Sequence, residues 1–374
     1  MDSAGSAGDV AARFSNWLKA TVESSGSDLH IKVGGPPAIR VSGELDRLDE
    51  PPLRPEETQE IALSIIPEER KERFEEFGEV DFAHSEPGIG RFRVNVFRQR
   101  GSVSMVLRTL RIGAPTIEEM GLPPVISQLA EGHRGLVVVT GPTGSGKTTT
   151  LAAMIGHINK NRKAHIVTIE DPIEVLHHDE VASINQREVG DDTQSFLLGL
   201  RAALRQDPDV ILIGEMRDAE TVQAALQAAE TGHLVFSTLH TVDATETINR
   251  LVDFFPPYQQ HQVRLTLAGA LRGVVSQRLV PTINGGRVPC IEALVMTGRV
   301  AERISDPTRT SEIHEVIKEG AFYGMQTFDQ SLLELVRAGW ISVDQAFEAS
   351  TAPHDLKLML EQAQLIAAGS GPMG

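Results

Sequence analysis

The sequence predicts an α/β protein with two domains, and three observations lead to this prediction. The chain has 374 residues, which is long for a single domain. Its second part carries short apolar runs separated by helical segments, the pattern of a doubly wound sheet of buried parallel strands. The first of these runs leads directly into a glycine-rich loop. The hydrophobic content of 41% is ordinary for a protein that buries a substantial core.

The first domain is expected to be α+β. Residues 1–8 are small and polar, and we expect a disordered leader there. Apolar residues at helical spacing in 10–22 predict an amphipathic helix. Short strands broken by glycine and proline are expected in 28–48, and helices in 55–77. Alternation of apolar and polar residues in 89–110 predicts two strands.

The domain boundaries follow from these patterns. We expect the first domain at 9–112, a linker at 113–120 and the second domain at 121–374. The tail of the second domain, from about residue 311, has helical periodicity. The apolar runs that predict buried strands of the second domain are 136–140, 165–169, 210–213 and 234–238.

Composition indicates a cytoplasmic protein and argues against nucleic acid as a partner. The single cysteine, Cys290, cannot form an internal disulfide, which fits a reducing compartment. The formal net charge of -16 repels nucleic acid and anionic lipid. The start of the chain lacks the basic and apolar segments of a signal peptide, and no run approaches the length of a membrane span. Any role at a membrane is therefore expected to come through partners.

The strongest motif is a phosphate-binding loop between a strand and a helix. Gly141–Thr148 matches G-x-x-x-x-G-K-[ST]. Glycines let backbone N–H groups surround a phosphate, and the helix N-terminus adds partial positive charge. We predict that Lys147 reaches the β- and γ-phosphates of ATP and that the Thr148 hydroxyl binds Mg²⁺. The predicted nucleotide-binding residues are Gly141, Pro142, Thr143, Gly144, Ser145, Gly146, Lys147, Thr148 and Thr149.

Polar residues that end three further strands are candidate catalytic groups. Glu215 follows the apolar run 210–213, Glu170 follows a second run, and His240 follows a third. The carboxyl ends of parallel strands form the ligand crevice of an open α/β sheet, so we expect these side chains to lie near Lys147. Glu215 is predicted to orient Mg²⁺ through water or to accept a proton from the attacking water.

An otherwise acidic chain carries a cluster of arginines in its first domain. Three interpretations are open: a solvated β-ribbon, a nucleic-acid patch, or arginine fingers that reach a triphosphate from another domain or subunit. The cluster consists of Arg91, Arg93, Arg98, Arg100, Arg108 and Arg111.

Four boxes together make the chain resemble the secretion ATPase superfamily, and within it the type IV pilus retraction ATPases of the PilT/PilU family. These are the phosphate-binding loop, an acidic box at 166–174, a second strand box at 204–215 and a histidine box at 231–241. The resemblance implies a PAS-like N-terminal domain and a RecA-like ATPase domain. It also implies a hexamer in which hydrolysis moves the domains, with Glu170 and Glu215 as catalytic glutamates and Arg93 and Arg108 as phosphate-sensing arginines.

The resemblance further implies a partner and a place in the cell. Retraction motors act on an inner-membrane pilus platform protein, so the chain is expected at the inner membrane through that machine. The extension ATPases carry a four-cysteine zinc module, which this chain lacks. Segments 186–193 and 324–330 look closer to PilU, and 300–308 departs from the Leu-Ile-Arg-Glu-Gly-type segment of principal motors. These features favour an accessory motor that assembles with a PilT-type partner.

Two other functions would use the same nucleotide-binding site. One is a traffic ATPase of a type II or type IV secretion system, and another is a nucleotide-binding scaffold that regulates a pilus motor without turnover. The presence of Lys147, Thr148, Glu170 and Glu215 argues against an inactive scaffold. A DNA-translocating enzyme is disfavoured by the negative charge.

Overall fold

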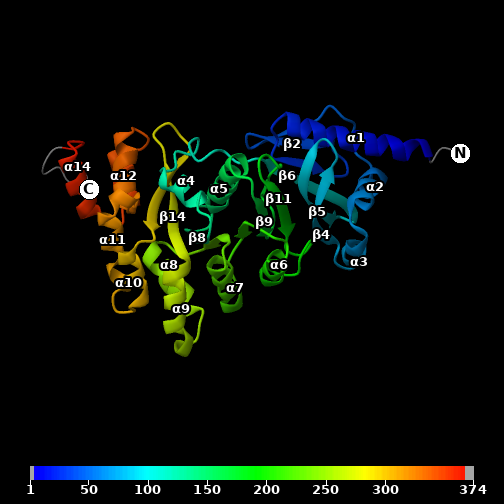
Figure 1. The fold of residues 1–374 in the computed structure, drawn as a ribbon. Coiled ribbons are helices and arrows are strands. Elements are labelled where there is room, and N and C mark those ends of the chain that lie inside the picture. The colour runs from blue at the N-terminus through cyan, green and yellow to red at the C-terminus, as the bar shows by residue number, and fades with distance from the viewer. Residues whose placement is uncertain (1–3, 367–374) are drawn as a thin grey trace. The chain divides into compact units, whose positions relative to one another are not determined.

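The structure is a computed structural model that describes residues 4–366. The chain divides into two compact units, with the boundary between Ile112 and Gly113. The two units are described separately below, and their elements are labelled in Figure 1. Residues 113–124 contain no helix or strand.

The first unit is an antiparallel sheet with three helices. Its six strands follow the order β3-β2-β1-β6-β5-β4, and Leu29, Phe92 and Val94 are among its fully buried side chains. The elements are α1 (Ala4–Glu23), β1 (Asp28–Ile31), β2 (Ala38–Val41), β3 (Glu44–Arg47), α2 (Pro55–Ile65), α3 (Glu68–Phe77), β4 (Glu79–Glu86), β5 (Gly90–Gln99), β6 (Ser102–Thr109) and β7 (Arg111–Ile112).

One expectation for this unit is wrong, and one of its strands was not predicted. Helix α1 begins at Ala4, so residues 4–8 are helical and not a disordered leader, while residues 1–3 lie outside the described part. Extending an existing helix requires no new nucleation, which allows short alanine- and glycine-containing segments to join it. Strand β4 was not predicted, although Val80 and Phe82 are buried and alternate with exposed Glu79 and Asp81.

The second unit is the mixed α/β domain that the sequence predicts. Its seven-stranded sheet has the order β11-β9-β12-β13-β8-β14-β15, parallel except for antiparallel β15. The elements up to β13 are α4 (Val125–Ala130), β8 (Gly135–Thr140), α5 (Lys147–Asn161), β9 (His165–Glu170), β10 (Val175–Leu176), β11 (Ser183–Glu188), α6 (Phe196–Ala203), β12 (Val210–Ile213), α7 (Ala219–Glu230) and β13 (Leu234–Leu239).

The remaining elements complete the sheet and add the C-terminal helices. They are α8 (Ala244–Asp253), α9 (Pro257–Ala270), β14 (Leu271–Pro281), β15 (Arg287–Val295), α10 (Gly298–Ser305), η1 (Thr310–Glu312), α11 (Ile313–Glu319), η2 (Ala321–Tyr323), α12 (Phe328–Arg337), α13 (Val343–Ala349) and α14 (Pro353–Gln362). Within residues 4–366, none of the helices has the length and apolar character needed to cross a membrane.

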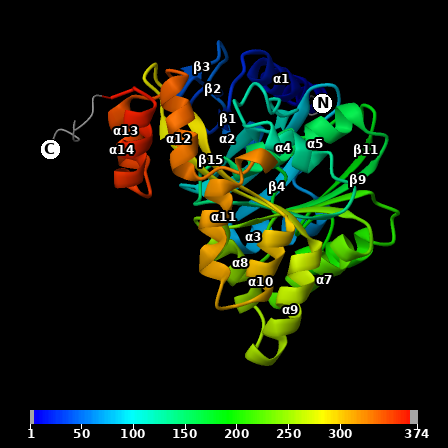
Figure 2. The same cartoon turned by 60° about the vertical axis from the view of Figure 1, so that its left-hand side comes forward.

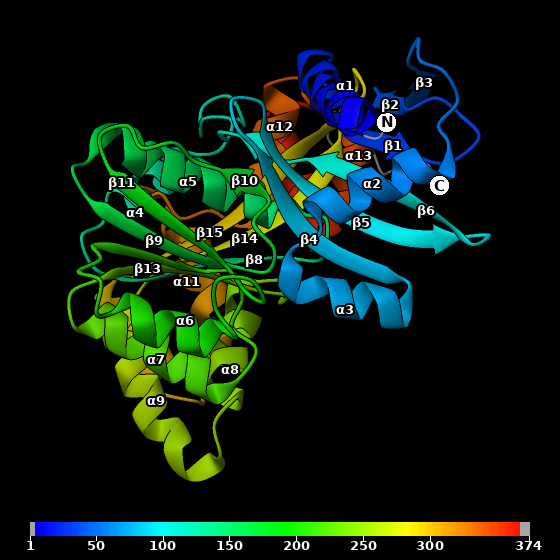
Figure 3. The same cartoon turned by 90° about the vertical axis from the view of Figure 1, so that its right-hand side faces the viewer.

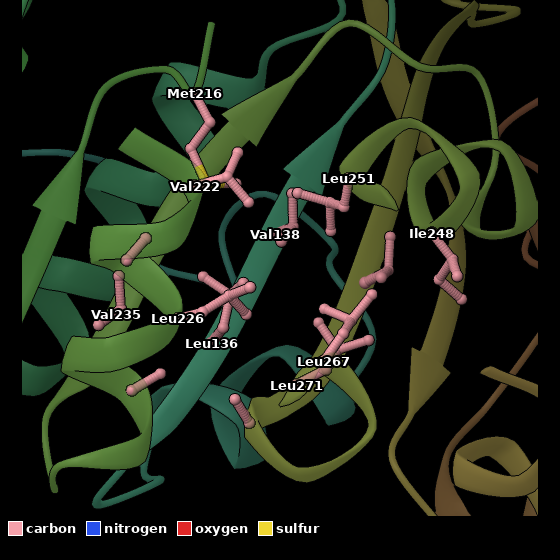
Figure 4. Packing of buried hydrophobic residues seen from close by; sticks show 14 of the residues in the cluster. Leu136, Val138, Met216, Val222, Leu226, Val235, Ile248, Leu251, Leu267 and Leu271 are labelled. Carbon is pink, nitrogen blue, oxygen red and sulfur yellow. The ribbon is translucent and has the colours of Figure 1, made fainter. Parts of the chain in front are cut away.

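Helices cover both faces of this sheet. Leu136 and Val138 of β8 face α7 and α8, where Leu226 and Leu251 lie, as Figure 4 shows. The intervening Val137 packs on the opposite face with residues of α4 and α5. Figure 3 shows α4 and α5 on one side of the sheet and α6, α7 and α9 on the other. Side chains buried on both faces explain the continuous apolar runs in the sequence.

The C-terminal helices are part of the second unit's core and are not a separable tail. Ile313 and Ile317 of α11 belong to the main apolar cluster beneath the sheet. Helices α12, α13 and α14, visible as a group in Figure 2, form a further cluster with Val280 and Cys290 of β14 and β15. A truncation at Ser311 would therefore remove core side chains, so it would not leave the ATPase domain intact.

A buried carboxylate joins this sheet to α8. Glu292 of β15 is 2% exposed, and its Oε1 accepts a hydrogen bond of 2.8 Å from the backbone N–H of Ala244. Nδ1 of His314 lies 4.0 Å from Oε2. Burial raises the pKa of Glu292 to about 7. The folded protein therefore binds more protons than the unfolded chain between pH 4.5 and about 7.

As pH rises through this window, we expect the native protein to become less stable because buried Glu292 ionises. The Glu292→Gln variant should not show this decrease. Above pH 7 the native carboxylate is ionised while buried, whereas glutamine keeps the acceptor for Ala244 without a charge. A pKa that differs by one between the folded and unfolded states corresponds to about 1.4 kcal/mol, so the variant should gain roughly 1–3 kcal/mol at pH 8. Urea unfolding from pH 5 to 8 measures this, with exposed Glu348→Gln as control. Parallel pH profiles for Glu292→Gln and the native protein would contradict it.

Candidate active site

The glycine-rich loop occupies the turn between β8 and α5. Gly141, Gly144 and Gly146 have φ angles of 141°, 78° and 88°, which favour glycine at these positions. Helix α5 begins at Lys147, so Lys147 and Thr148 of the motif form the first residues of the helix. Because the first N–H groups of a helix have no partner within the helix, this turn presents several donors to an anion.

The Lys147 side chain is held within the loop. Its Nζ donates to the carbonyl oxygens of Gly141 at 2.7 Å and Pro142 at 3.0 Å. Burial lowers the pKa of Lys147, and the nearby Glu215 carboxylate opposes that shift. The ammonium group thus lies where a phosphate bound by the loop would meet it.

A cavity of about 520 Å³ opens over this loop. That volume lies in the usual range for small-molecule sites. Among the predicted residues, Gly141, Pro142 and Ser145 do not line the cavity. Those that do are Thr143, Gly144, Gly146, Lys147, Thr148, Thr149, Glu170, Glu215 and His240. The cavity thus brings together Lys147, Glu170, Glu215 and His240, whereas the predicted Arg93 and Arg108 are not among its lining residues.

Glu170 is held rigidly at the end of β9. Its Oε1 accepts hydrogen bonds from Thr168 Oγ1 at 2.6 Å and from Gln186 Nε2 at 3.1 Å. Burial raises the pKa of Glu170 despite these hydrogen bonds. Raised carboxyl pKa values are typical of sites where a proton is exchanged.

Glu215 lies between two basic side chains. Arg217 Nε donates to Oε2 at 2.7 Å, and His240 Nε2 lies 3.4 Å from Oε1. Nη1 of Arg217 also lies 3.9 Å from Oδ2 of Asp171. The hydrogen bond to Glu215 raises the pKa of Arg217, which therefore remains a cation beside the carboxylate. Sequence reasoning missed Arg217, and its only signal was its place two residues after Glu215.

Arg93 and Arg108 are neighbours on the first unit. They are Cα partners in the antiparallel pairing of β5 with β6, and both are exposed. Arg108 Nε donates to Asp28 Oδ1 at 2.8 Å. The residues that line the cavity all belong to the second unit.

The cavity offers oxygen atoms of the kind that Mg²⁺ takes beside a nucleotide. Within residues 4–366, no three His, Cys, Asp or Glu side chains are arranged to hold a metal. Mg²⁺ commonly takes one or two protein oxygens, with water and phosphate oxygens completing its shell. The Thr148 hydroxyl and the Glu215 carboxylate offer such oxygens in this cavity.

Comparisons with known proteins show similarity to ATPases over most of the chain. The family described as type II/IV secretion system protein matches residues 87–351. The type IV pilus retractation ATPase PilT of Pseudomonas aeruginosa is 45% identical, over 90% of this chain and 98% of the relative. The type IV pilus ATPase PilU of the same organism is also 45% identical, over 93% and 91%. A crystal structure of the pilus retraction motor PilT with bound ADP has a TM-score of 0.82 and 48% identity, covering 91% of this chain and 98% of that one.

Proposed function

The chain belongs to the type II/IV secretion system protein family, and on that premise we propose that it is an ATPase motor that couples ATP hydrolysis to retraction of a type IV pilus. The observation that carries this proposal is the meeting of Lys147, Glu170, Glu215 and His240 in one cavity over the phosphate-binding loop. The pilus assignment is supported by the similarity to relatives named PilT and PilU over most of the chain.

In the proposed mechanism, loop N–H groups and Lys147 hold the triphosphate, and the Thr148 hydroxyl supplies an oxygen to Mg²⁺. When bound, Mg²⁺ neutralises charge that develops on the phosphates. Glu215 orients the attacking water and accepts its proton, while Arg217 fixes the orientation of that carboxylate. Glu170, held by Thr168 and Gln186, supports the reaction from the neighbouring strand.

The mechanical part of the proposal concerns assembly. We propose that the first unit is a PAS-like domain and that the second is a RecA-like domain with the C-terminal helices. We propose that six copies form a ring, in which Arg93 and Arg108 reach a triphosphate held by another domain or subunit. Hydrolysis then moves the units as rigid bodies, and the motion passes to an inner-membrane pilus platform protein. We propose that the motor lies in the cytoplasm and meets the membrane only through these partners.

We propose an accessory role beside a PilT-type motor. Support comes from segment 300–308, which departs from the segment of principal motors and spans much of α10. Identity to PilT and PilU is equal at 45%, so overall similarity does not separate the roles.

Deletion of the gene tests both the retraction function and the accessory role. In a strain without this protein, we expect pili to be assembled normally but to retract slowly or under less load, with reduced twitching. Twitching and single-pilus retraction assays measure this, and re-expression of the native chain is the control. Immobile, hyperpiliated cells would instead identify a principal motor. Unchanged pili with impaired export of a secreted protein would support the second candidate, a traffic ATPase of the family's secretion branch.

A further inference from the structure

One glutamine joins the phosphate-binding loop to a strand far away in the sequence. Gln277 lies on β14 and is fully buried. Its Nε2 donates to the carbonyl oxygen of Ser145 at 2.7 Å, and its Oε1 accepts from Thr150 Oγ1 at 2.7 Å. Both polar ends of the amide are thus used, one by the loop and one by the first turn of α5.

The loop is packed against Gln277 at two further places. A Cβ at Gly141 would come within 2.2 Å of the Gln277 carbonyl oxygen, and a Cβ at Gly146 within 2.7 Å of its Nε2. The preceding residue of β14, Ser276, accepts a hydrogen bond of 3.1 Å from Thr140 at the end of β8. Strand β14 therefore contacts Gly141 and Gly146, the first and last glycines of the loop, and Thr150 in the helix that follows.

The bond to Ser145 determines where the next N–H group points. In a planar trans peptide, the C=O of one residue and the N–H of the next point in opposite directions. Because the Ser145 carbonyl is directed to Gln277, the Gly146 N–H is directed away from β14. Gly146 lines the cavity, so the orientation of this peptide decides whether its N–H faces a bound phosphate.

We propose that Gln277 is a positioning residue that holds the loop in its phosphate-binding conformation before a nucleotide arrives. The inference rests on the proposed function, since it concerns the same nucleotide. A loop with three glycines loses much conformational freedom when it orders. Because Gln277 orders the loop in advance, nucleotide binding does not have to offset this loss of conformational entropy. Preorganisation of this kind increases affinity.

The decisive variant is Gln277→Met, which keeps the length of the side chain but removes both hydrogen bonds. In the full chain with Mg²⁺, we expect ADP affinity to fall about ten-fold or more, equivalent to about 1.4 kcal/mol for ten-fold. Calorimetric titration measures it, with exposed Gln223→Met as the control of native affinity. Thr150→Val removes one of the two bonds and should weaken binding less, with no added effect in the Gln277→Met background.

Amide hydrogen exchange separates positioning from simple stabilisation. Without nucleotide, peptides that cover 141–150 should exchange faster in Gln277→Met than in the native protein, while exchange in the first unit is unchanged. With saturating ADP the two proteins should exchange alike in this segment. If Gln277→Met fails to fold, Thr150→Val carries the same comparison.

The outcomes distinguish this inference from the proposed function. If the native protein binds no ADP, the nucleotide site itself is wrong. If the native protein binds ADP, while Gln277→Met and Thr150→Val bind with native affinity and exchange normally at the loop, only the role of Gln277 is refuted. Loss of folding in Gln277→Met combined with native binding in Thr150→Val would also overturn it, because Gln277 would then serve the core alone.

Discussion

Lys147→Ala is expected to abolish ATP hydrolysis while the fold is retained. The Lys147 ammonium lies among loop carbonyls within the cavity, and alanine places no positive charge there. We expect the rate to fall by about 1,000-fold or more, which is about 4 kcal/mol of transition-state stabilisation. Phosphate release from purified protein under ring-forming conditions measures this effect.

The same variant should change stability little. Burial lowers the pKa of Lys147, so its charged form is disfavoured by the folded environment. Alanine removes that buried charge but also the hydrogen bonds to Gly141 and Pro142, so the two effects oppose each other and we expect only a small change in melting temperature. Lys160→Ala, at an exposed position of the same helix, is the matched control. Substantial turnover in Lys147→Ala would reject the assignment of the loop.

Much of the site could be predicted because its residues follow local rules. The loop has a fixed spacing between a strand and a helix. Glu170 is the last residue of a buried strand, and Glu215 and His240 follow buried strands within two residues. Strand ends of a parallel sheet lie at one edge, so residues far apart in sequence could be placed together. Their partners, such as Arg217, depend on side-chain packing that no spacing reveals.

Strand β14 shows why other residues that contact the loop could not be predicted from the sequence. It begins at Leu271, directly after α9 ends at Ala270, without a glycine or proline between them. Ser276 and Gln277 interrupt its apolar run with polar side chains, although both are fully buried. Their burial is possible because they bond to Thr140 and the loop, which lie more than a hundred residues earlier. Such long-range pairing leaves no periodic signal.

Arg93→Ala is the second variant with a large expected effect. If Arg93 touches the triphosphate as proposed, its loss should lower kcat by about 1,000-fold or more, since arginine fingers contribute 10³–10⁵ in rate. Arg93 is exposed on β5, so its removal should leave the fold intact. Arg47→Ala, exposed on β3 of the same sheet, is the control. ATPase assays need a parallel measurement of oligomeric state, because loss of the ring would mimic loss of the finger.

Arg108→Ala should lower kcat similarly but should also cost stability. Although burial alone raises it, hydrogen bonds from Ser27 and Arg108 hold the pKa of Asp28 below its ordinary value. Removing Arg108 leaves this carboxylate with one partner fewer, at a cost of about 0.5–1 kcal/mol because Arg108 itself is largely exposed to water. Adding Asp28→Asn removes the charge, so the double variant should regain stability and remain inactive. If activity returns together with stability, Arg108 acts only by pairing with Asp28 and not as a finger.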